Sequence, residues 1–311
     1  QRKYNVVATK GNFNNHIGVP KTLLRLLPEH EMAVIEMGAN HPGEIKTLVN
    51  IAHPNFGVIT NVGKAHIEGF GSFEGVINTK CELYEFLANT KGKAFVNQDN
   101  EILSQKAIEK GLETIPYGMS ITNAEITSSD PFLAISWKGV NIQTQLIGRY
   151  NFENVLAAIT IGKNFNLSDD EIAKAIEEYT PTNNRSQFKK TNFNELIIDA
   201  YNANPTSMNA SLDNFIQIKN DNKAVVLGDM KELGAVSETE HQKVADKLTQ
   251  SSISDIFLIG QNFAQTECPR ANKFPDVNAL NQYLQKNPIK GKLVLVKGSN
   301  SMKLIECVNL L

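Results

Sequence analysis

One short stretch of the chain, Met32-Ala33-Val34-Ile35-Glu36-Met37-Gly38, is apolar until it reaches a carboxylate and a glycine. Its length and the flanking glycine favour a buried β-strand. Similar runs occupy residues 6–9, 56–63 and 93–97, and helical patterns lie between them at residues 21–27, 43–51, 73–87 and 102–110. This alternation predicts an α/β domain with a mostly parallel central sheet and helices on both of its faces.

The pattern changes between residues 114 and 146. Apolar and polar residues alternate at 114–117, 124–128, 132–137 and 141–146, and turn residues such as Asp130-Pro131 and Lys138-Gly139 separate these runs. The pattern predicts a small antiparallel meander attached to the parallel sheet. Two helices are expected after the meander, at residues 151–165 and 169–178.

A polar, helix-breaking stretch at residues 180–184 is the best candidate for a linker. Strands are then expected at 196–200, 224–228, 256–260 and 292–297, and helices at 207–219, 238–249 and 277–285. This second block predicts a Rossmann-like α/β domain. It has no Gly-x-Gly-x-x-Gly, so its fold alone implies no dinucleotide. We therefore expect two domains, at residues 1–182 and 183–311.

Composition excludes several classes of protein. The 311 residues carry a net charge of -2, which provides no basic field for nucleic acid and no polybasic membrane anchor. We expect no signal peptide, because the first residues are polar, and no stretch of the sequence approaches the roughly 20 apolar residues that a membrane span needs. Cys81, Cys268 and Cys307 lie too far apart for a zinc cluster and fit a reducing compartment. We expect a cytoplasmic monomer that neither binds nucleic acid nor inserts into membranes.

The first residues of the chain bear on whether it is part of a larger protein. No methionine begins it, and the first apolar run follows almost at once, at Tyr4. We expect the chain to begin within a larger protein.

Three candidate side chains lie in the first block. Glu36 ends a predicted strand, where open α/β sheets bind ligands and where a carboxylate can hold Mg²⁺; capping a helix or facing solvent is equally compatible with that position. His66 also follows a strand, although a lone histidine is more often structural. Lys80 lies on a predicted helix beside apolar residues, so it is either a solvated lysine or a partly buried one whose neutral amine is available for covalent chemistry.

Asparagine is abundant in two further segments of this block. Residues 9–20, which include Thr9, Asn14 and Asn15, form a loop that could grip a polar substrate or a hydrated metal. Asn151 and Asn154 lie three residues apart at the start of a predicted helix. An N-cap role is enough to explain an asparagine at position 151, but it explains Asn154 less well.

The second block carries polar residues at the ends of its predicted strands. Asp199 ends one strand, and Asn204-Pro205 predicts the N-cap and first position of the helix that follows. Lys297-Gly298-Ser299 ends the last strand. Arg185, just after the linker, could close over an anion.

Together these segments resemble the Mur ligases in order and spacing, over essentially the whole chain. The matching segments are residues 9–20, 34–40, 61–72, 80–82, 151–158, 199–205, 227–234 and 296–299. The resemblance implies an ATP-dependent ligase of peptidoglycan synthesis that uses Mg²⁺ and forms an acyl phosphate. It implies UDP-N-acetylmuramoyl-tripeptide and D-alanyl-D-alanine as substrates, since residues 12–20, 199–205 and 227–230 favour that member of the family.

The resemblance also implies roles for individual residues. Glu36, His66 and Lys80 would be catalytic and would hold magnesium, Lys80 as a carbamylated lysine. Asn154 would contact adenine, Arg185 the phosphates and Asp199 the ribose, with Tyr201 also in the nucleotide site. The substrate-binding residues would be Thr9, Asn14, Asn15, Lys297 and Ser299.

The chain also departs from the family pattern. It contains no Gly-x-x-Gly-Lys-Thr phosphate loop, and Asn300-Ser301 follows Ser299 where many relatives have an arginine. We therefore expect the chain by itself to be inactive. The alternatives are another Mur ligase, a folylpolyglutamate-type ligase, or a non-catalytic remnant that binds a peptidoglycan precursor.

Overall fold

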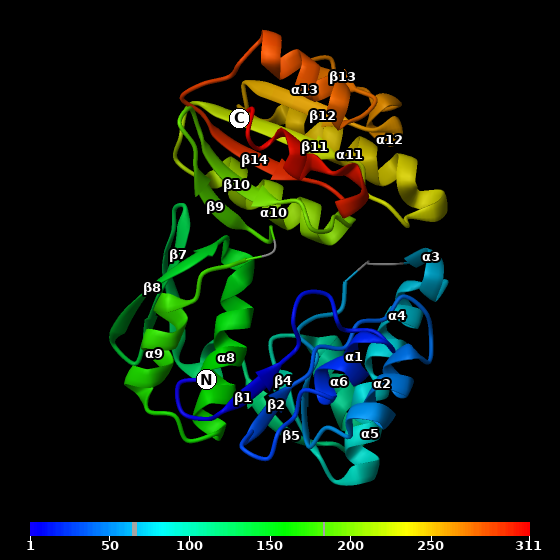
Figure 1. Ribbon diagram of the computed structural model, residues 1–311, viewed down its shortest axis with the longest axis vertical. Coiled ribbons are helices and arrows are strands. Elements are labelled where there is room, and N and C mark those ends of the chain that lie inside the picture. Colours follow the sequence, from blue (N-terminus) through cyan, green and yellow to red (C-terminus); the bar gives the residue numbers. More distant parts are fainter. Residues whose placement is uncertain (64–66, 183) are drawn as a thin grey trace. The chain divides into compact units, whose positions relative to one another are not determined.

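A computed structural model describes residues 1–63, 67–182 and 184–311 (Figure 1). The chain forms two compact units. The first contains residues 1–125, 135–142 and 152–178, and the second contains residues 126–134, 143–151 and 179–311. The boundary expected between residues 182 and 183 stays a prediction. No helix among the described residues is long and apolar enough to cross a membrane.

Parallel strands form the framework of the first unit. β1 (Val6–Ala8) pairs with β2 (Met32–Val34), and β3 (Phe56–Val58), β4 (Lys93–Asn97) and β5 (Glu113–Tyr117) form a second parallel sheet in that order. The assignment of residues 114–117 to the meander was wrong, because β5 pairs in parallel with β4. The intervening helix α6 (Glu101–Glu109) is the crossover that parallel neighbours require.

Helices of this unit bury apolar residues against the strands and against one another. Val19 of α1 (Gly18–Leu23) packs with Leu48 and Val49 of α2 (Glu44–Ala52). The single helix expected at 73–87 is two helices, α4 (Phe73–Lys80) and α5 (Glu82–Thr90), which meet at Cys81. The remaining helices are α3 (Ile67–Phe70), α7 (Met119–Thr122), α8 (Phe152–Asn164) and α9 (Asp169–Glu178).

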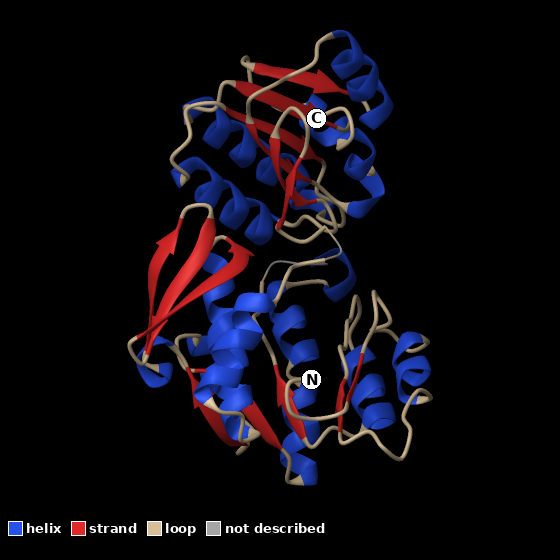
Figure 2. Cartoon of the chain, turned by 60° about the vertical axis from the view of Figure 1, so that its left-hand side comes forward, coloured by secondary structure: helices blue, strands red, loops and turns tan. Residues whose placement is uncertain are grey.

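The meander has three strands, β6 (Ala124–Ser129), β7 (Phe132–Trp137) and β8 (Val140–Ile147), in that spatial order (Figure 2). Residues 130–131 and 138–139 connect them. Connections this short join antiparallel neighbours and cannot join parallel ones, so the expected antiparallel pairing is confirmed.

The main sheet of the second unit has six strands in the order β13-β12-β11-β14-β10-β9. All neighbouring pairs are parallel except β9 with β10. The strands are β9 (Gln187–Lys190), β10 (Glu195–Asp199), β11 (Lys223–Gly228), β12 (Asp255–Ile259), β13 (Ala271–Phe274) and β14 (Leu293–Lys297). The sequence did not predict β9 or β13, which are the two edges of the sheet.

Helices cover both faces of this sheet. Alternate residues of each strand point to opposite faces. Ile197 and Val225 therefore pack with α10 (Pro205–Gln217) and α11 (Ser237–Gln250), while Ile198 and Val226 pack with α13 (Val277–Lys286). The predicted start of α10 is confirmed, since Asn204 caps it and Pro205 is its first residue.

The strand order of this unit determines where a ligand can bind. The chain runs outward from β10 to β13 and then returns to place β14 between β10 and β11. Asp199 of β10 is the register partner of Lys297 of β14, which is in turn the partner of Leu227 of β11. Ligands of open α/β sheets bind outside these carboxyl ends, where the direction of winding reverses.

Candidate functional site

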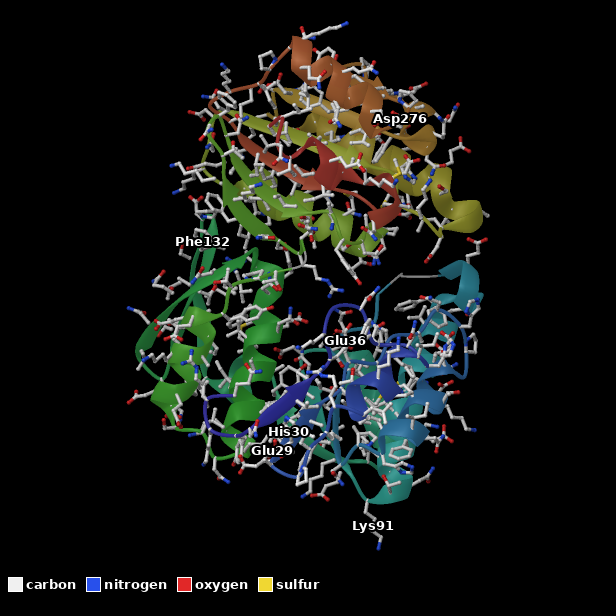
Figure 3. The ribbon with its side chains drawn as sticks, viewed as in Figure 1. Glu29, His30, Glu36, Lys91, Phe132 and Asp276 are labelled. Atoms are coloured by element: carbon white, nitrogen blue, oxygen red, sulfur yellow. The ribbon has the colours of Figure 1, made fainter. Side chains whose placement is uncertain are left out.

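In the first unit, polar side chains gather around Glu36, just after the end of β2. The backbone N–H of Glu36 donates to Thr9 Oγ1 at 2.9 Å, and Asn14 Nδ2 donates to Glu36 Oε1 at 2.9 Å. Thr9 N also donates to Val34 O at 3.0 Å. Figure 3 shows the exposed Glu36 at one end of this unit, with Lys91 at the opposite end. The structure therefore brings together three of the predicted site residues, Thr9, Asn14 and Glu36.

Asn15 shapes the loop in which Asn14 lies. Its Oδ1 accepts from the backbone N–H groups of Ile17 and Gly18, at 3.1 and 2.9 Å, and so satisfies donors at the start of α1. A Cβ at Gly18 would lie 2.3 Å from the backbone of Phe13, so the turn requires glycine there. The richness of the loop in Gly and Asn thus has a local cause. A contact of Asn15 with substrate stays a prediction.

Lys80 is the last residue of α4 and is half-buried. Its Nζ donates to the backbone oxygen of Asn61 at 2.8 Å, and burial lowers the pKa of its ammonium. This favours the partly buried alternative over a solvated surface lysine. Glu82, two residues later, is occupied elsewhere, because its oxygens accept from the N–H groups of Gly43 and Lys46 at the start of α2, at 2.8 and 2.6 Å.

Of the magnesium set predicted from the sequence, the structure describes Glu36 and Lys80. His66 lies outside the described residues. Among the residues that are described, no group of three or more His, Cys, Asp or Glu side chains could hold a metal ion. The group that binds Glu36 is a neutral amide, so Asn14 leaves the negative charge of this exposed carboxylate available. Carboxylate oxygens are ligands that Mg²⁺ prefers, and Glu36 fits that ion.

In the second unit, four predicted residues meet at the ends of β10 and β14. Lys297 Nζ donates to Asp199 Oδ2 at 2.5 Å and approaches Asn202 O at 3.4 Å. The other oxygen of Asp199 accepts from Ser186 N at 3.2 Å. The guanidinium of Arg185 lies 4.3 Å from the centre of the Tyr201 ring. This stacking leaves the N–H edges of an exposed guanidinium available to an anion.

Ser299 lies in an adjoining network that sequence reasoning largely missed. Its Oγ accepts from Lys231 N at 3.1 Å, and its N donates to Asp229 O at 3.3 Å. Asp229 is fully buried and accepts from the N–H groups of Asn262 and Phe263, both at 3.0 Å. The network therefore fixes the loops that follow β11, β12 and β14.

His241 completes this network from α11. It is fully buried, its Nε2 accepts from Met230 N at 3.0 Å, and its Nδ1 lies 2.7 Å from Ser237 O. Burial lowers its pKa. These contacts fit a neutral imidazole protonated at Nδ1. One signal could have found it, because Val244, Ala245 and Leu248 follow at helical spacing on the same buried face.

Asn154 lies exposed in the first turn of α8, where the sequence placed it. Asn151 comes just before that helix, and its Nδ2 donates back to Ile147 O at 2.8 Å. The contact of Asn154 with adenine stays a prediction.

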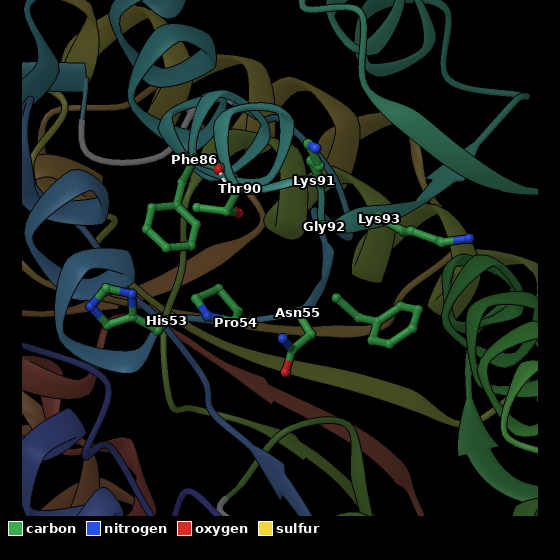
Figure 4. Close-up of a pocket in the computed structure, with 9 residues that line it drawn as sticks. His53, Pro54, Asn55, Phe86, Thr90, Lys91, Gly92 and Lys93 are labelled. Carbon is green, nitrogen blue, oxygen red and sulfur yellow. Dashed lines mark hydrogen bonds between the residues drawn. The ribbon is translucent and has the colours of Figure 1, made fainter.

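A shallow cavity of about 360 Å³ lies elsewhere in the first unit (Figure 4). Phe56 begins β3 and Lys93 begins β4, so the cavity is at the amino edge of the sheet and away from the strand ends that carry Glu36. None of the predicted site residues lines it. The lining residues are His53, Pro54, Asn55, Phe56, Phe86, Thr90, Lys91, Gly92 and Lys93.

Comparisons with known proteins point to one family. The family description "Mur ligase middle domain" matches residues 1–162, and "Mur ligase, glutamate ligase domain" matches residues 184–300. The UDP-N-acetylmuramoyl-tripeptide–D-alanyl-D-alanine ligase of Bacillus subtilis is 34% identical over 98% of this chain and 70% of its own length. The Escherichia coli enzyme of the same name is 33% identical over 99% of this chain and 71% of its own length.

Solved structures agree with these matches. A crystal structure of MurF from Acinetobacter baumannii covers 99% of this chain with a TM-score of 0.84 and 28% identity, and the chain covers 71% of it. MurF from Thermotoga maritima in complex with ADP covers 99% of this chain with a TM-score of 0.86, and the chain covers 73% of it. At 21% identity, that second likeness concerns the fold alone.

Proposed function

The chain belongs to the Mur ligase family, and on that basis we propose that it is the middle and C-terminal part of an ATP-dependent ligase that joins D-alanyl-D-alanine to UDP-N-acetylmuramoyl-tripeptide. One observation carries this assignment. Relatives with that activity in their names are 33–34% identical along nearly all of this chain. The two other classes considered from the sequence, another Mur ligase or folylpolyglutamate-type ligase and a precursor-binding remnant, become outcomes of the test below.

The chemistry explains the need for ATP. A carboxylate does not acylate an amine at neutral pH, because its oxygen is a poor leaving group. An oxygen of the tripeptide carboxylate attacks the γ-phosphorus of ATP, which gives an acyl phosphate and ADP. The amine of D-alanyl-D-alanine then adds to the acyl carbon, and the tetrahedral intermediate expels phosphate. The protein mainly positions the reactants and stabilises charge.

In the first unit, we assign the magnesium site to Glu36, Lys80 and His66. Bound Mg²⁺ would neutralise charge that develops on the phosphates. Half-burial of Lys80 favours its neutral amine, and that amine can take up CO₂ with loss of a proton to form a carbamate. The carbamate would supply a second anionic ligand beside Glu36. Thr9, Asn14 and Asn15 would contact the nucleotide-linked peptide or its magnesium.

We assign nucleotide-binding roles to individual residues. Asn154 would bind adenine, and Asp199 and Tyr201 would contact the ribose side. Arg185 would contact the phosphates through the guanidinium edges that the Tyr201 ring leaves open. Lys297 and Ser299 would lie near the peptide or dipeptide. We further propose that the protein works as a monomer in the cytoplasm, where its nucleotide-linked substrate would be available.

A substrate-omission assay tests this function. The whole gene product, with any residues that precede Gln1, should release phosphate only when tripeptide precursor, D-alanyl-D-alanine, ATP and Mg²⁺ are all present. Turnover with a single amino acid in place of the dipeptide would reassign the chain to a sister ligase. Precursor binding without phosphate release under any combination would favour the non-catalytic remnant.

A further inference from the structure

The hydroxyl of Tyr150 occupies a specific position in the second unit. Tyr150 belongs to the short helix η1 (Arg149–Asn151), and its hydroxyl lies 2.7 Å from Ser186 Oγ. Burial raises the pKa of Tyr150 to about 12, and the negative charge of Asp199 adds to the effect. The phenol is therefore protonated at neutral pH and can donate.

Ser186, the hydrogen-bond partner of Tyr150, lies in a strained turn. It is buried and has a left-handed backbone with φ of 48°, which is uncommon outside glycine. Its backbone N–H donates to Asp199 Oδ1 at 3.2 Å. Two contacts, one through the side chain and one through the backbone, thus fix a turn at the end of the segment that follows α9.

Arg185 directly precedes this fixed turn. Its backbone direction is set by Ser186, and its guanidinium stacks 4.3 Å from the Tyr201 ring centre. Arg185 is therefore held at both ends, by Ser186 at its backbone and by Tyr201 at its charged group. Loss of the hold on Ser186 would let the guanidinium sample other positions.

Gly148 gives independent support for the placement of the Tyr150 ring. It has φ of 94°, and a Cβ there would lie 2.3 Å from Cε1 of that ring. Any other residue at position 148 would displace the ring. The absence of a side chain at Gly148 thus leaves the room that the Tyr150 ring occupies.

We propose that Tyr150 is a positioning residue that orients Arg185 toward the nucleotide phosphates through Ser186. The inference rests on the proposed function, because it takes the role of Arg185 from there. Tyr150 itself need not touch the nucleotide. Its hydroxyl reduces the conformational freedom of Arg185 before ATP binds, and preorganisation of this kind raises affinity without adding a contact.

The first test is Tyr150→Phe in the whole gene product, which removes only the hydroxyl. The KM for ATP should rise roughly fivefold, the effect of one lost hydrogen bond, with kcat little changed. Tyr84→Phe is the matched control, because Tyr84 is also buried while its hydroxyl lacks a hydrogen-bond partner among the described residues. That control should leave KM unchanged. Ser186→Gly tolerates the positive φ, removes the partner oxygen, and should reproduce the effect of Tyr150→Phe.

The second test combines Tyr150→Phe with Arg185→Ala. If Tyr150 acts through Arg185, its removal has no further effect on the KM for ATP once Arg185 is gone. If the two substitutions raise the KM for ATP independently, so that their fold-changes multiply in the double variant, the proposal is overturned. A Tyr150→Phe variant that loses thermal stability but keeps the parent's KM for ATP would also overturn it. If Arg185→Ala alone leaves the KM for ATP unchanged, the assigned role of Arg185 fails and the positioning proposal fails with it. A raised KM in Arg185→Ala beside a normal KM in Tyr150→Phe overturns the positioning proposal only.

Discussion

The ammonium of Lys297 lies 2.5 Å from Asp199 Oδ2, and the two residues are direct register partners on neighbouring parallel strands. The Lys297 side chain is 1% exposed and that of Asp199 is 14% exposed. This pair joins the carboxyl ends of β10 and β14, and Asp199 also binds Ser186 at the end of the linker segment. In this structure Lys297 is directed at Asp199, and its contact with substrate stays a prediction.

Removing either partner of this pair should have unequal effects on stability. Asp199→Ala leaves a buried ammonium without its counter-charge, so we expect a loss of about 3–5 kcal/mol in the free energy of unfolding. Lys297→Met replaces the buried group with an apolar one and leaves only the more exposed Asp199 unpaired, so its loss should be smaller. Denaturant unfolding of both variants and of the double variant checks this. Equal losses, or a double variant less stable than Asp199→Ala, would contradict the account.

Lys80 offers a test of the carbamate. Lys80→Ala should lower kcat roughly a hundredfold or more, since a charge that stabilises the transition state is lost, while unfolding is little affected. Lys80→Arg should be equally inactive, because a guanidinium keeps its proton and cannot take up CO₂. Lys91→Gln, at the opposite edge of the sheet, should turn over normally. A ¹³CO₂-dependent carbamate signal that disappears in Lys80→Arg would support the assignment, whereas full activity of Lys80→Arg would exclude it.

His241 predicts a pH dependence of stability. Burial lowers its pKa from 6.5, while Asp229 opposes that shift and Lys231 adds to it. The unfolded chain therefore binds a proton at higher pH than the folded one, so stability falls as pH drops below about 6.5, by at most about 1.4 kcal/mol per pH unit. His241→Gln can still accept from Met230 N but does not titrate. Its unfolding free energy should vary less between pH 7.5 and 5.5 than that of the parent; an identical slope would show that His241 is not responsible.

Gly260 is required by the buried carboxylate beside it. It has φ of 121°, and a Cβ there would lie 2.3 Å from the Cγ of Asp229. Gly260→Ala should therefore destabilise the second unit by more than about 2 kcal/mol. Gly291→Ala is the control, since Gly291 also has a positive φ, 68°, but nothing within 4 Å of its Cβ position. Gly291→Ala should lower the free energy of unfolding by only about 1 kcal/mol, from the left-handed backbone conformation alone. Equal thermal shifts for the two variants would contradict this explanation.

Strands and helices with strong local patterns were predictable from the sequence. Residues 93–97 form β4 as expected, and the helix expected at 277–285 is α13. β9 and β13 were missed because edge strands are half-exposed and polar, as the sequence Gln-Phe-Lys-Lys of β9 illustrates. β5 was placed in the wrong sheet because a short alternating run does not reveal whether its neighbour is parallel or antiparallel.

The sequence predicted which site residues lie at the ends of strands, but it did not predict which of them meet. The sequence placed Asp199 and Lys297 at the ends of strands, but their pairing depends on β14 lying between β10 and β11, which no local pattern records. His241 was missed because the start of its helix, Ser-Glu-Thr-Glu-His, has the composition of a solvated surface. Its burial follows from the tertiary packing of α11 against the sheet.

The most direct measurement follows the carboxylate oxygen through the reaction. The whole gene product would be incubated with ATP, Mg²⁺, D-alanyl-D-alanine and a tripeptide precursor that carries ¹⁸O in both oxygens of the reacting carboxylate. An acyl phosphate intermediate transfers one labelled oxygen to the released phosphate and leaves the other in the new amide. We predict one ¹⁸O in each released phosphate, by mass spectrometry. Release of unlabelled phosphate, with the lost ¹⁸O appearing in water, would contradict the account.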